Sequence, residues 1–175
     1  NSVEECFEDL TPHIFAVETG LSSDPEMNWR VSDLDGRTLI SNSDAHSALN
    51  IGREANLLNV EMNYDSIRHA LRTGNPDQFL GTIEFYPEEG KYHYDGHRKC
   101  GTCYHPSESK KRGDICPVCG KTLTLGVAYR VEALADRPAG EKPERHHPFY
   151  SLIPLAEILS EIYGVGVKTK KVNHA

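Results

Sequence analysis

The sequence predicts an α/β domain, followed by a small four-cysteine metal module and a short helical tail. Short β-rich runs alternate with helical patterns between residues 14 and 85. Two Cys-x-x-Cys pairs lie between residues 100 and 119, and apolar residues recur at helical spacing between residues 155 and 162. We therefore expect three segments, residues 1–90, 91–136 and 137–175.

The first segment contains the strands and helices of the predicted α/β domain. Residues 14–18 and 37–40 are short apolar runs next to turn-rich stretches, so both are expected to be strands. The pattern from residue 47 to residue 58 predicts a helix, and residues 79–85 are rich in strand-forming types. A further helix is expected between an Asp65 cap and a Gly74 stop.

Beyond the cysteine pairs, residues 122–127 predict a returning strand and residues 128–136 a short helix. A linker rich in proline and glycine follows. Residues 153–163 then predict a helix with Pro154 in its first turn and Gly164 at its stop.

The composition argues against a protein that spans a membrane. Only 38% of the 175 residues are hydrophobic, and no stretch approaches eighteen consecutive apolar residues. The first residues have neither the basic start nor the apolar stretch of a secretory signal, so we expect the cytoplasm. Four of the five cysteines occur in pairs, which suits a metal site in a reducing compartment, and the lone Cys6 is expected to be buried.

Charge is distributed unevenly along the chain. Residues 1–90 hold 5 Lys or Arg against 17 Asp or Glu, whereas residues 91–130 hold 8 against 3. This asymmetry indicates an acidic surface suited to cations and a basic surface suited to phosphates. Ordinary solvated surface is the alternative for both segments.

The cysteine spacing predicts a structural zinc site. Each Cys-x-x-Cys turn places two sulfurs on one side of an ion, and the two pairs supply a tetrahedral shell from Cys100, Cys103, Cys116 and Cys119. A redox pair would leave the second pair unexplained, and an iron–sulfur cluster is the other alternative. His97 and His105 are surplus to this count.

Basic residues surround the cysteines, with tyrosines between them. This combination is typical of surfaces that contact nucleic-acid phosphates and stack on bases, although exposed lysines are common in any protein. The candidate DNA contacts here are Arg98, Lys99, Lys110, Lys111 and Arg112.

Asp44 and His46 follow a predicted strand, where active sites of α/β barrels lie. A carboxylate and an imidazole two residues apart can both reach a catalytic metal. The alternative is that Asp44 caps the next helix and His46 is a surface residue.

These motifs resemble the polymerase-and-histidinol-phosphatase (PHP) domain family. The string SNSDAHS at residues 41–47, followed by GREAN at 52–56, is similar to the last metal-binding motif of that family. The order of ETGLSSDP at 18–25, FYPEEGKYH at 85–93, the cysteine pairs and LADR at 134–137 resembles the endonuclease Q branch more closely. The resemblance covers most of the chain.

The resemblance implies part of a distorted β/α barrel joined to a four-cysteine zinc-ribbon module, in an enzyme that nicks DNA on the 5′ side of deaminated bases. Asp44 and His46 would hold a catalytic divalent ion such as Zn2+, Mn2+ or Mg2+. Glu18, Asp24 and Trp29 are further candidate DNA contacts; Trp29 could stack on a nucleotide, and the alternative for it is a packing role. The early His-x-His motif and the middle His and Glu ligands of the family are absent. We therefore expect this chain to be inactive alone and to self-associate through exposed strand edges.

Two other functions remain open. The chain is alternatively a nucleic-acid-binding zinc module without chemistry of its own, or part of a PHP phosphoesterase that acts on a small phosphate ester.

His146 and His147 are expected to be loop residues. Gly164 and Gly166, followed by lysines, resemble the phosphate-binding turn of a helix-hairpin-helix, with a helix stop and solvated tail as the alternative.

Overall fold

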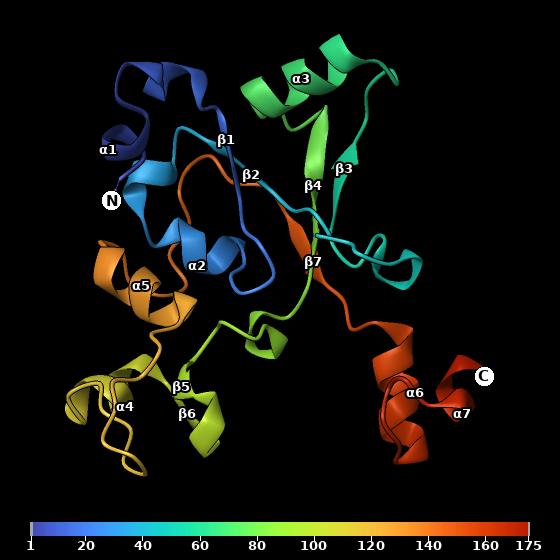
Figure 1. Cartoon of the computed structure of the whole chain (residues 1–175). Coiled ribbons are helices and arrows are strands. Elements are labelled where there is room, and N and C mark those ends of the chain that lie inside the picture. Colours follow the sequence, from blue (N-terminus) through green and yellow to red (C-terminus); the bar gives the residue numbers. More distant parts are fainter. Residues whose placement is uncertain (1, 175) are drawn as a thin grey trace.

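The computed structural model describes residues 2–174 as a mixed α/β arrangement (Figure 1). Within these residues the strands form three small sheets. The first pairs β1 and β2 in parallel, the second has the order β3-β4-β7, and the third is an antiparallel β5–β6 pair. The strands are β1 (Ala16–Glu18), β2 (Thr38–Ile40), β3 (Ala55–Leu58), β4 (Phe79–Glu84), β5 (Asp95–His97), β6 (Thr102–Tyr104) and β7 (Phe149–Ser151).

Helices surround these sheets, and most of them are short. They are α1 (Val3–Phe7), α2 (Pro25–Trp29), α3 (Tyr64–Thr73), α4 (Pro106–Lys111), α5 (Val127–Leu134), α6 (Leu155–Tyr163) and α7 (Lys170–Asn173). Short 3-10 helices lie at η1 (Glu8–His13), η2 (Ser32–Leu34), η3 (Ala48–Asn50), η4 (Pro87–Glu89) and η5 (Arg98–Cys100). None of the helices in residues 2–174 is both long and apolar enough to cross a membrane.

Most predicted elements are confirmed. The strands expected at residues 14–18, 37–40 and 79–85 correspond to β1, β2 and β4, and the two last predicted helices correspond to α5 and α6. Helix α3 ends where expected, because Gly74 adopts the left-handed conformation with φ of 54°. Its cap is Asn63, whose side chain accepts a hydrogen bond from the Ser66 N–H, so the prediction of Asp65 as the cap was wrong.

Three further predictions were wrong. Residues 47–58 form the η3 turn and strand β3 in place of a helix, because residues 55–58 pair with β4 in an antiparallel ladder. Residues 122–127 make only two isolated bridges, Gly96 with Thr124 and Ile115 with Thr122, and Val127 already begins α5. Cys6 is exposed, whereas burial was expected.

The chain returns to the central sheet after residue 140. Strand β7 runs parallel to β4, and the carbonyl oxygen of Pro148 approaches Gly81 so closely that a Cβ at Gly81 would lie 2.2 Å from it. Gly81 also has φ of 139°, a conformation that side chains with a Cβ rarely adopt. Phe79 is fully buried and packs edge-on against His147, so residues distant in sequence complete this core.

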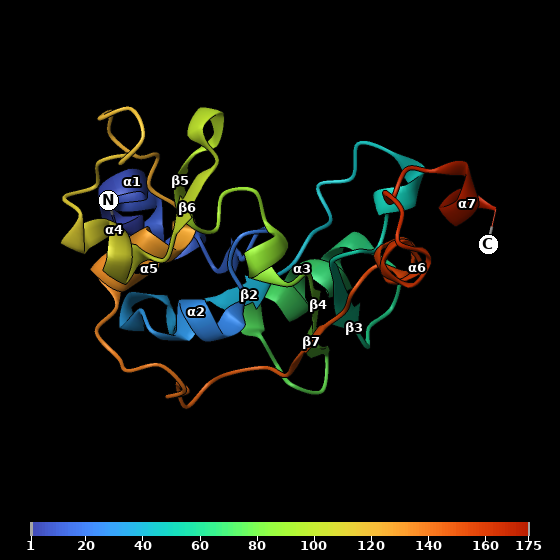
Figure 2. The same cartoon turned by 90° about the horizontal axis from the view of Figure 1, so that it is seen from below.

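The cysteine-bearing segment, or module, is residues 91–136. Its last residue, Asp136, and the next residue, Arg137, contact the first part of the chain. The Arg137 guanidinium donates to the backbone oxygen of Trp29 at 2.8 Å and pairs with the Asp35 carboxylate. The Asp136 carboxylate accepts from the N–H of Ser32 at 2.9 Å. These contacts fix α5 beside α2, as Figure 2 shows from below.

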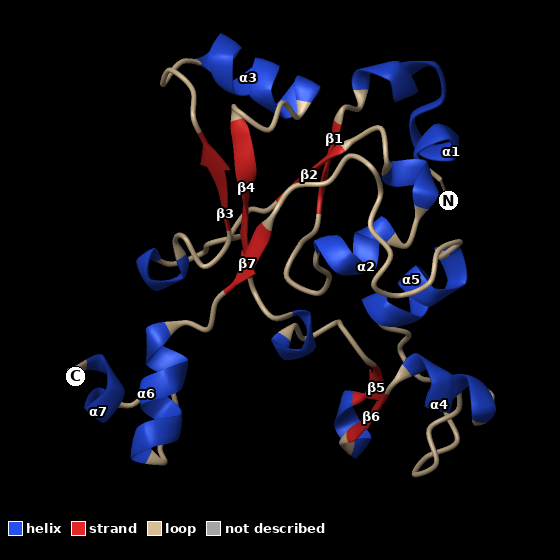
Figure 3. Ribbon diagram, turned by 180° about the vertical axis from the view of Figure 1, so that it is seen from behind, coloured by secondary structure: helices blue, strands red, loops and turns tan. Residues whose placement is uncertain are grey.

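Figure 3 shows the strands β1, β2, β3, β4 and β7 gathered at the centre, with α3 across one end. The pair α6 and α7 lies on the opposite side of the molecule from α4, β5 and β6 in both Figures 1 and 2. The central strands therefore stand between two peripheral structures. The domain boundaries near residues 90 and 136 stay a prediction.

Candidate functional site

Asp44 and His46 lie in the loop that follows β2. Strands β1 and β2 are parallel and in register, with Glu18 opposite Ile40, so their carboxyl ends meet at one edge. The side chains of Asp44 and His46 are 70% and 84% exposed at this edge. The Nδ1 atom of His46 lies 2.8 Å from the backbone oxygen of Asp44, so both residues share one compact turn. Their exposure leaves both side chains free to meet a ligand.

The base of this loop is held by side chains from the start of β3. The Asn56 amide accepts from the Ser41 N–H at 3.0 Å and donates to the Ser41 carbonyl at 2.8 Å, as a neighbouring strand would. The Arg53 Nε donates to the Ser43 carbonyl at 2.8 Å. Ser41 itself is fully buried. The loop is therefore anchored through residues 41–43, and the exposed pair projects beyond that anchor.

Two buried carboxyl groups lie beneath this edge, and sequence reasoning missed both. The Glu84 carboxyl is fully buried and accepts hydrogen bonds from the hydroxyls of Thr19 and Thr82. Burial raises the pKa of Glu84 to about 7. Glu54 is 2% exposed and accepts from the N–H of Phe85, and burial raises its pKa as well. The signal that could have found Glu84 is an acidic residue inside a run of otherwise strand-forming residues.

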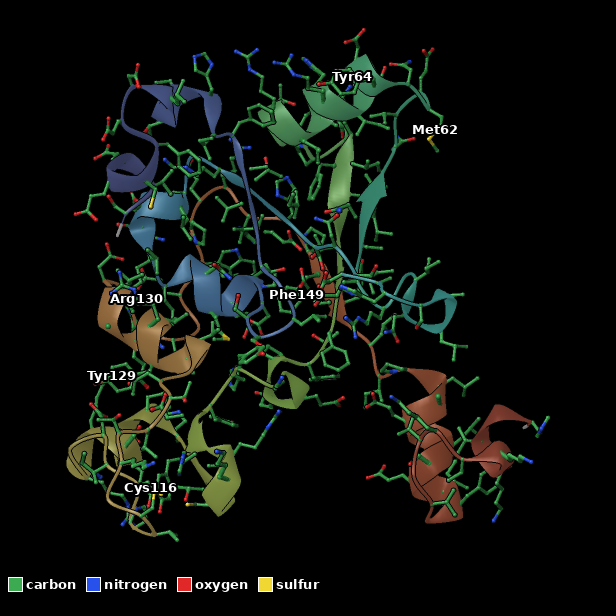
Figure 4. The ribbon with its side chains drawn as sticks, viewed as in Figure 1. Met62, Tyr64, Cys116, Tyr129, Arg130 and Phe149 are labelled. Atoms are coloured by element: carbon green, nitrogen blue, oxygen red, sulfur yellow. The ribbon has the colours of Figure 1, made fainter. Side chains whose placement is uncertain are left out.

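The structure brings four potential metal ligands together in the cysteine-bearing segment. The ligand atoms of His97, Cys100, Cys116 and Cys119 all lie within 4.8 Å of one another. Cys116 is fully buried, and the Nδ1 atom of His97 lies 3.3 Å from the Cys119 sulfur. Figure 4 shows Cys116 in the module built by β5, β6 and α4. This mixed set of nitrogen and sulfur donors fits a zinc ion.

Cys103 lies outside this cluster, and the β6 strand explains why. Thr102 pairs with His97 across the two strands, and its hydroxyl lies 3.4 Å from the Cys116 sulfur. Successive side chains of a strand point to opposite faces, so Cys103 faces away from the cluster. The shell of four cysteines therefore stays a prediction, and the structure offers a second possible shell in which His97 takes the place of Cys103. The signal for His97 was its position three residues before Cys100.

The environment of Cys116 favours the thiolate that a metal requires. The pKa of Cys116 is lowered to about 6, mainly by a hydrogen bond with the Thr102 hydroxyl. The N–H groups of Val118 and Cys119 lower it further. A deprotonated sulfur is the form that binds zinc. The geometry and the acidity of this cysteine thus agree with a metal-binding role.

The basic residues of this segment differ in their contacts. Arg98, Lys99 and Lys111 are exposed and form no ion pair within residues 2–174. Lys110 instead lies 3.1 Å from Glu132, and Arg112 lies 2.8 Å from Glu108. The role of all five residues as DNA contacts stays a prediction. Arg98, Lys99 and Lys111 are the three whose charge is not already paired with a carboxylate of a described residue.

The remaining candidates occupy different settings. Trp29 is 5% exposed and packs edge-on against Phe149, which favours a packing role over stacking on a base. Asp24 caps α2 by accepting from the Met27 N–H, while Glu18 is exposed at the end of β1. Within the described part of the chain, Asp44 and His46 belong to no group of three or more metal-binding side chains. Any metal they hold needs other ligands.

Comparison with curated proteins identifies two longer relatives. The chain is 37% identical over 180 residues to an uncharacterized protein of Methanocaldococcus jannaschii, and 34% identical over 171 residues to one of Bacillus subtilis. These alignments cover 98% and 97% of this chain but 22% and 41% of the relatives. The chain therefore spans less than half the length of either relative. No family model matches it.

Comparison with solved structures is more specific. The lesion-specific endonuclease PfuEndoQ of Pyrococcus furiosus matches 91% of this chain with a TM-score of 0.76 and 32% identity. A complex of endonuclease Q with a 27-mer duplex, which has an abasic lesion at the active site, matches 99% with a TM-score of 0.85 and 30% identity. Both similar structures are endonuclease Q. The chain covers 40% and 44% of these proteins.

Proposed function

We propose that this chain is part of an endonuclease Q-type enzyme that cleaves DNA at damaged or deaminated bases. The observation that carries the proposal is the structural similarity to endonuclease Q on abasic-lesion DNA, which extends over 99% of the chain. Sequence identity of 30% over the same span supports a shared function as well as a shared fold. The motif resemblance to the PHP domain family, carried by residues 41–47 and 52–56 within the same span, agrees with it.

Asp44 and His46 are the proposed ligands of a catalytic divalent metal. Their exposed side chains at the carboxyl edge of β1 and β2, on an anchored loop, support this assignment. A bound divalent ion would lower the pKa of a water molecule and stabilise charge on the phosphodiester. The site needs more ligands than these two, and the much greater length of the relatives offers a source for them.

A structural zinc ion is proposed for the cysteine-bearing segment. Cys100, Cys116 and Cys119 are common to the sequence-based set and to the cluster in the structure. The fourth ligand is Cys103 in the first set and His97 in the second. Either four-ligand shell leaves no position for a reacting water, so the ion would stabilise the fold.

The test compares this chain with a longer protein that includes the remainder of the family's catalytic domain. The longer protein should nick a duplex with one abasic site or deoxyuracil when a divalent metal is added, and the 175-residue chain should not. Asp44→Asn and His46→Asn should each remove the activity of the longer protein, while Asp65→Asn, on α3, should retain it. Unchanged nicking by both loop variants would refute the assignment.

A non-catalytic nucleic-acid-binding module is the second candidate. It is favoured by the absence, within residues 2–174, of a third metal ligand beside Asp44 and His46. Under this alternative, DNA binding depends on salt, survives loss of both residues, and is abolished by charge reversal at Lys110, Lys111 and Arg112. Nicking by the longer protein would exclude it.

A further inference from the structure

The C-terminal end of the chain carries a concentrated positive charge. Residues 164–174 contain three lysines and no acidic residue. Lys168, Lys170 and Lys171 are all exposed, and Lys168 and Lys170 form no ion pair with described residues. Lys171 lies over the Tyr163 ring, 4.6 Å from its centroid. Two of the three ammonium groups are therefore free to meet an anion.

The turn between α6 and α7 is held by its own hydrogen bonds. The Val165 N–H donates to the Ser160 carbonyl at 3.1 Å, and the Ser160 hydroxyl donates back to the Val165 carbonyl. Gly164 adopts φ of 60°, which lets the chain reverse after α6. The lysines thus project from an ordered hairpin, so less conformational entropy is lost when they bind.

The same turn presents unpaired backbone donors. Among the described residues, none accepts a hydrogen bond from the N–H of Gly166, Val167 or Lys168, and all three residues are exposed. Successive free N–H groups form a concave surface that favours an anion. Lysine ammonium groups beside such donors suit a phosphate group better than a carboxylate side chain, because a phosphate offers several oxygens at once.

Helix α6, which carries the hairpin, begins near the turn that follows the candidate catalytic loop (Figures 1 and 2). Figures 1 and 2 both place η3, which follows the Asp44–His46 loop, beside α6. The cysteine-bearing module lies on the other side of the central strands. A nucleic-acid duplex that passes the loop would therefore meet basic surfaces on two sides.

We propose that the α6–α7 hairpin is a second DNA-binding surface, in which Lys168, Lys170 and the free N–H groups of the turn contact the phosphate backbone. This inference rests on the proposed action on DNA. The contact is independent of base sequence and holds the duplex against the loop that carries Asp44 and His46. It adds to the basic surface of the cysteine-bearing module.

The test measures binding of this 175-residue chain to a fluorescent duplex with one abasic site, at several salt concentrations. Each phosphate contact contributes about 0.9 to the slope of log affinity against log salt, so Lys168→Gln with Lys170→Gln should make the slope shallower by about 1.8. A fourfold rise in salt should then weaken the parent's binding by about 12-fold more than the variant's.

Arg68→Gln with Arg72→Gln is the matched control, because it removes the same charge from exposed positions on α3. The control should keep the parent slope, and both variants should keep the parent's zinc content and circular dichroism. If the parent binds DNA but the hairpin variant keeps its slope, the inference is overturned and the proposed function stands. If the parent shows no salt-dependent binding, DNA as the partner of this chain is refuted together with the hairpin contact.

Discussion

Replacing the buried Glu84 by glutamine should remove a pH-dependent loss of stability. Burial holds the pKa of Glu84 at about 7, against an ordinary value of 4.5. Between these values the unfolded chain releases the proton while the folded chain retains it. Since the unfolded state then binds fewer protons, the free energy of unfolding falls as pH rises, and it levels off above pH 7.

The size of the effect follows from the two pKa values. Between pH 5 and pH 8, the difference between these pKa values lowers the free energy of unfolding by about 2.5 kcal/mol through this one group. The Glu84→Gln side chain has a similar shape and can still meet the hydroxyls of Thr19 and Thr82, but it carries no titrating proton. The variant should therefore lose about 2.5 kcal/mol less stability than the parent between these pH values.

Urea unfolding at pH 5 and pH 8 measures this difference. Trp29 is the single tryptophan and is buried, so its fluorescence reports unfolding of the part that contains Glu84. Glu144→Gln is the control, because Glu144 is exposed and should leave the parent's pH dependence unchanged. Equal pH dependence in the parent and in Glu84→Gln would refute the reasoning that burial keeps Glu84 protonated.

Three further predictions concern metal binding and packing. If His97 is the fourth ligand, Cys103→Ser should keep one zinc per chain while His97→Ala weakens its retention during dialysis against a chelator; the reverse result would establish the four-cysteine shell. Asn56→Ala leaves both backbone groups of the buried Ser41 without their partner, so urea unfolding should show a loss of about 1–3 kcal/mol, and no loss would contradict the anchor. Gly81→Ala meets both a close contact and positive φ, so it should lower the thermal midpoint strongly, and a parent-like midpoint would contradict the β4–β7 packing.

Local chemistry explains which parts of the fold were predictable. The short strands β1, β2 and β4 and the helices α5 and α6 were found because apolar spacing and turn residues act within one element. Strand β3 was missed because residues 47–58 have helical spacing, and the ladder with β4 overrides that preference. Strand β7 gave no clear signal, since its place depends on packing against β4 across more than sixty residues.

The sequence by itself determined the cysteine spacing, the charge asymmetry and the Asp44–His46 motif, because each of these is a property of neighbouring residues. Only the tertiary structure decided that His97 joins three cysteines while Cys103 points away, because the pairing of β5 with β6 sets which side chains share a face. It also decided that Glu54 and Glu84 are buried beneath the candidate loop. Burial, and the raised pKa that it causes, arises when strands distant in sequence pack together and exclude water.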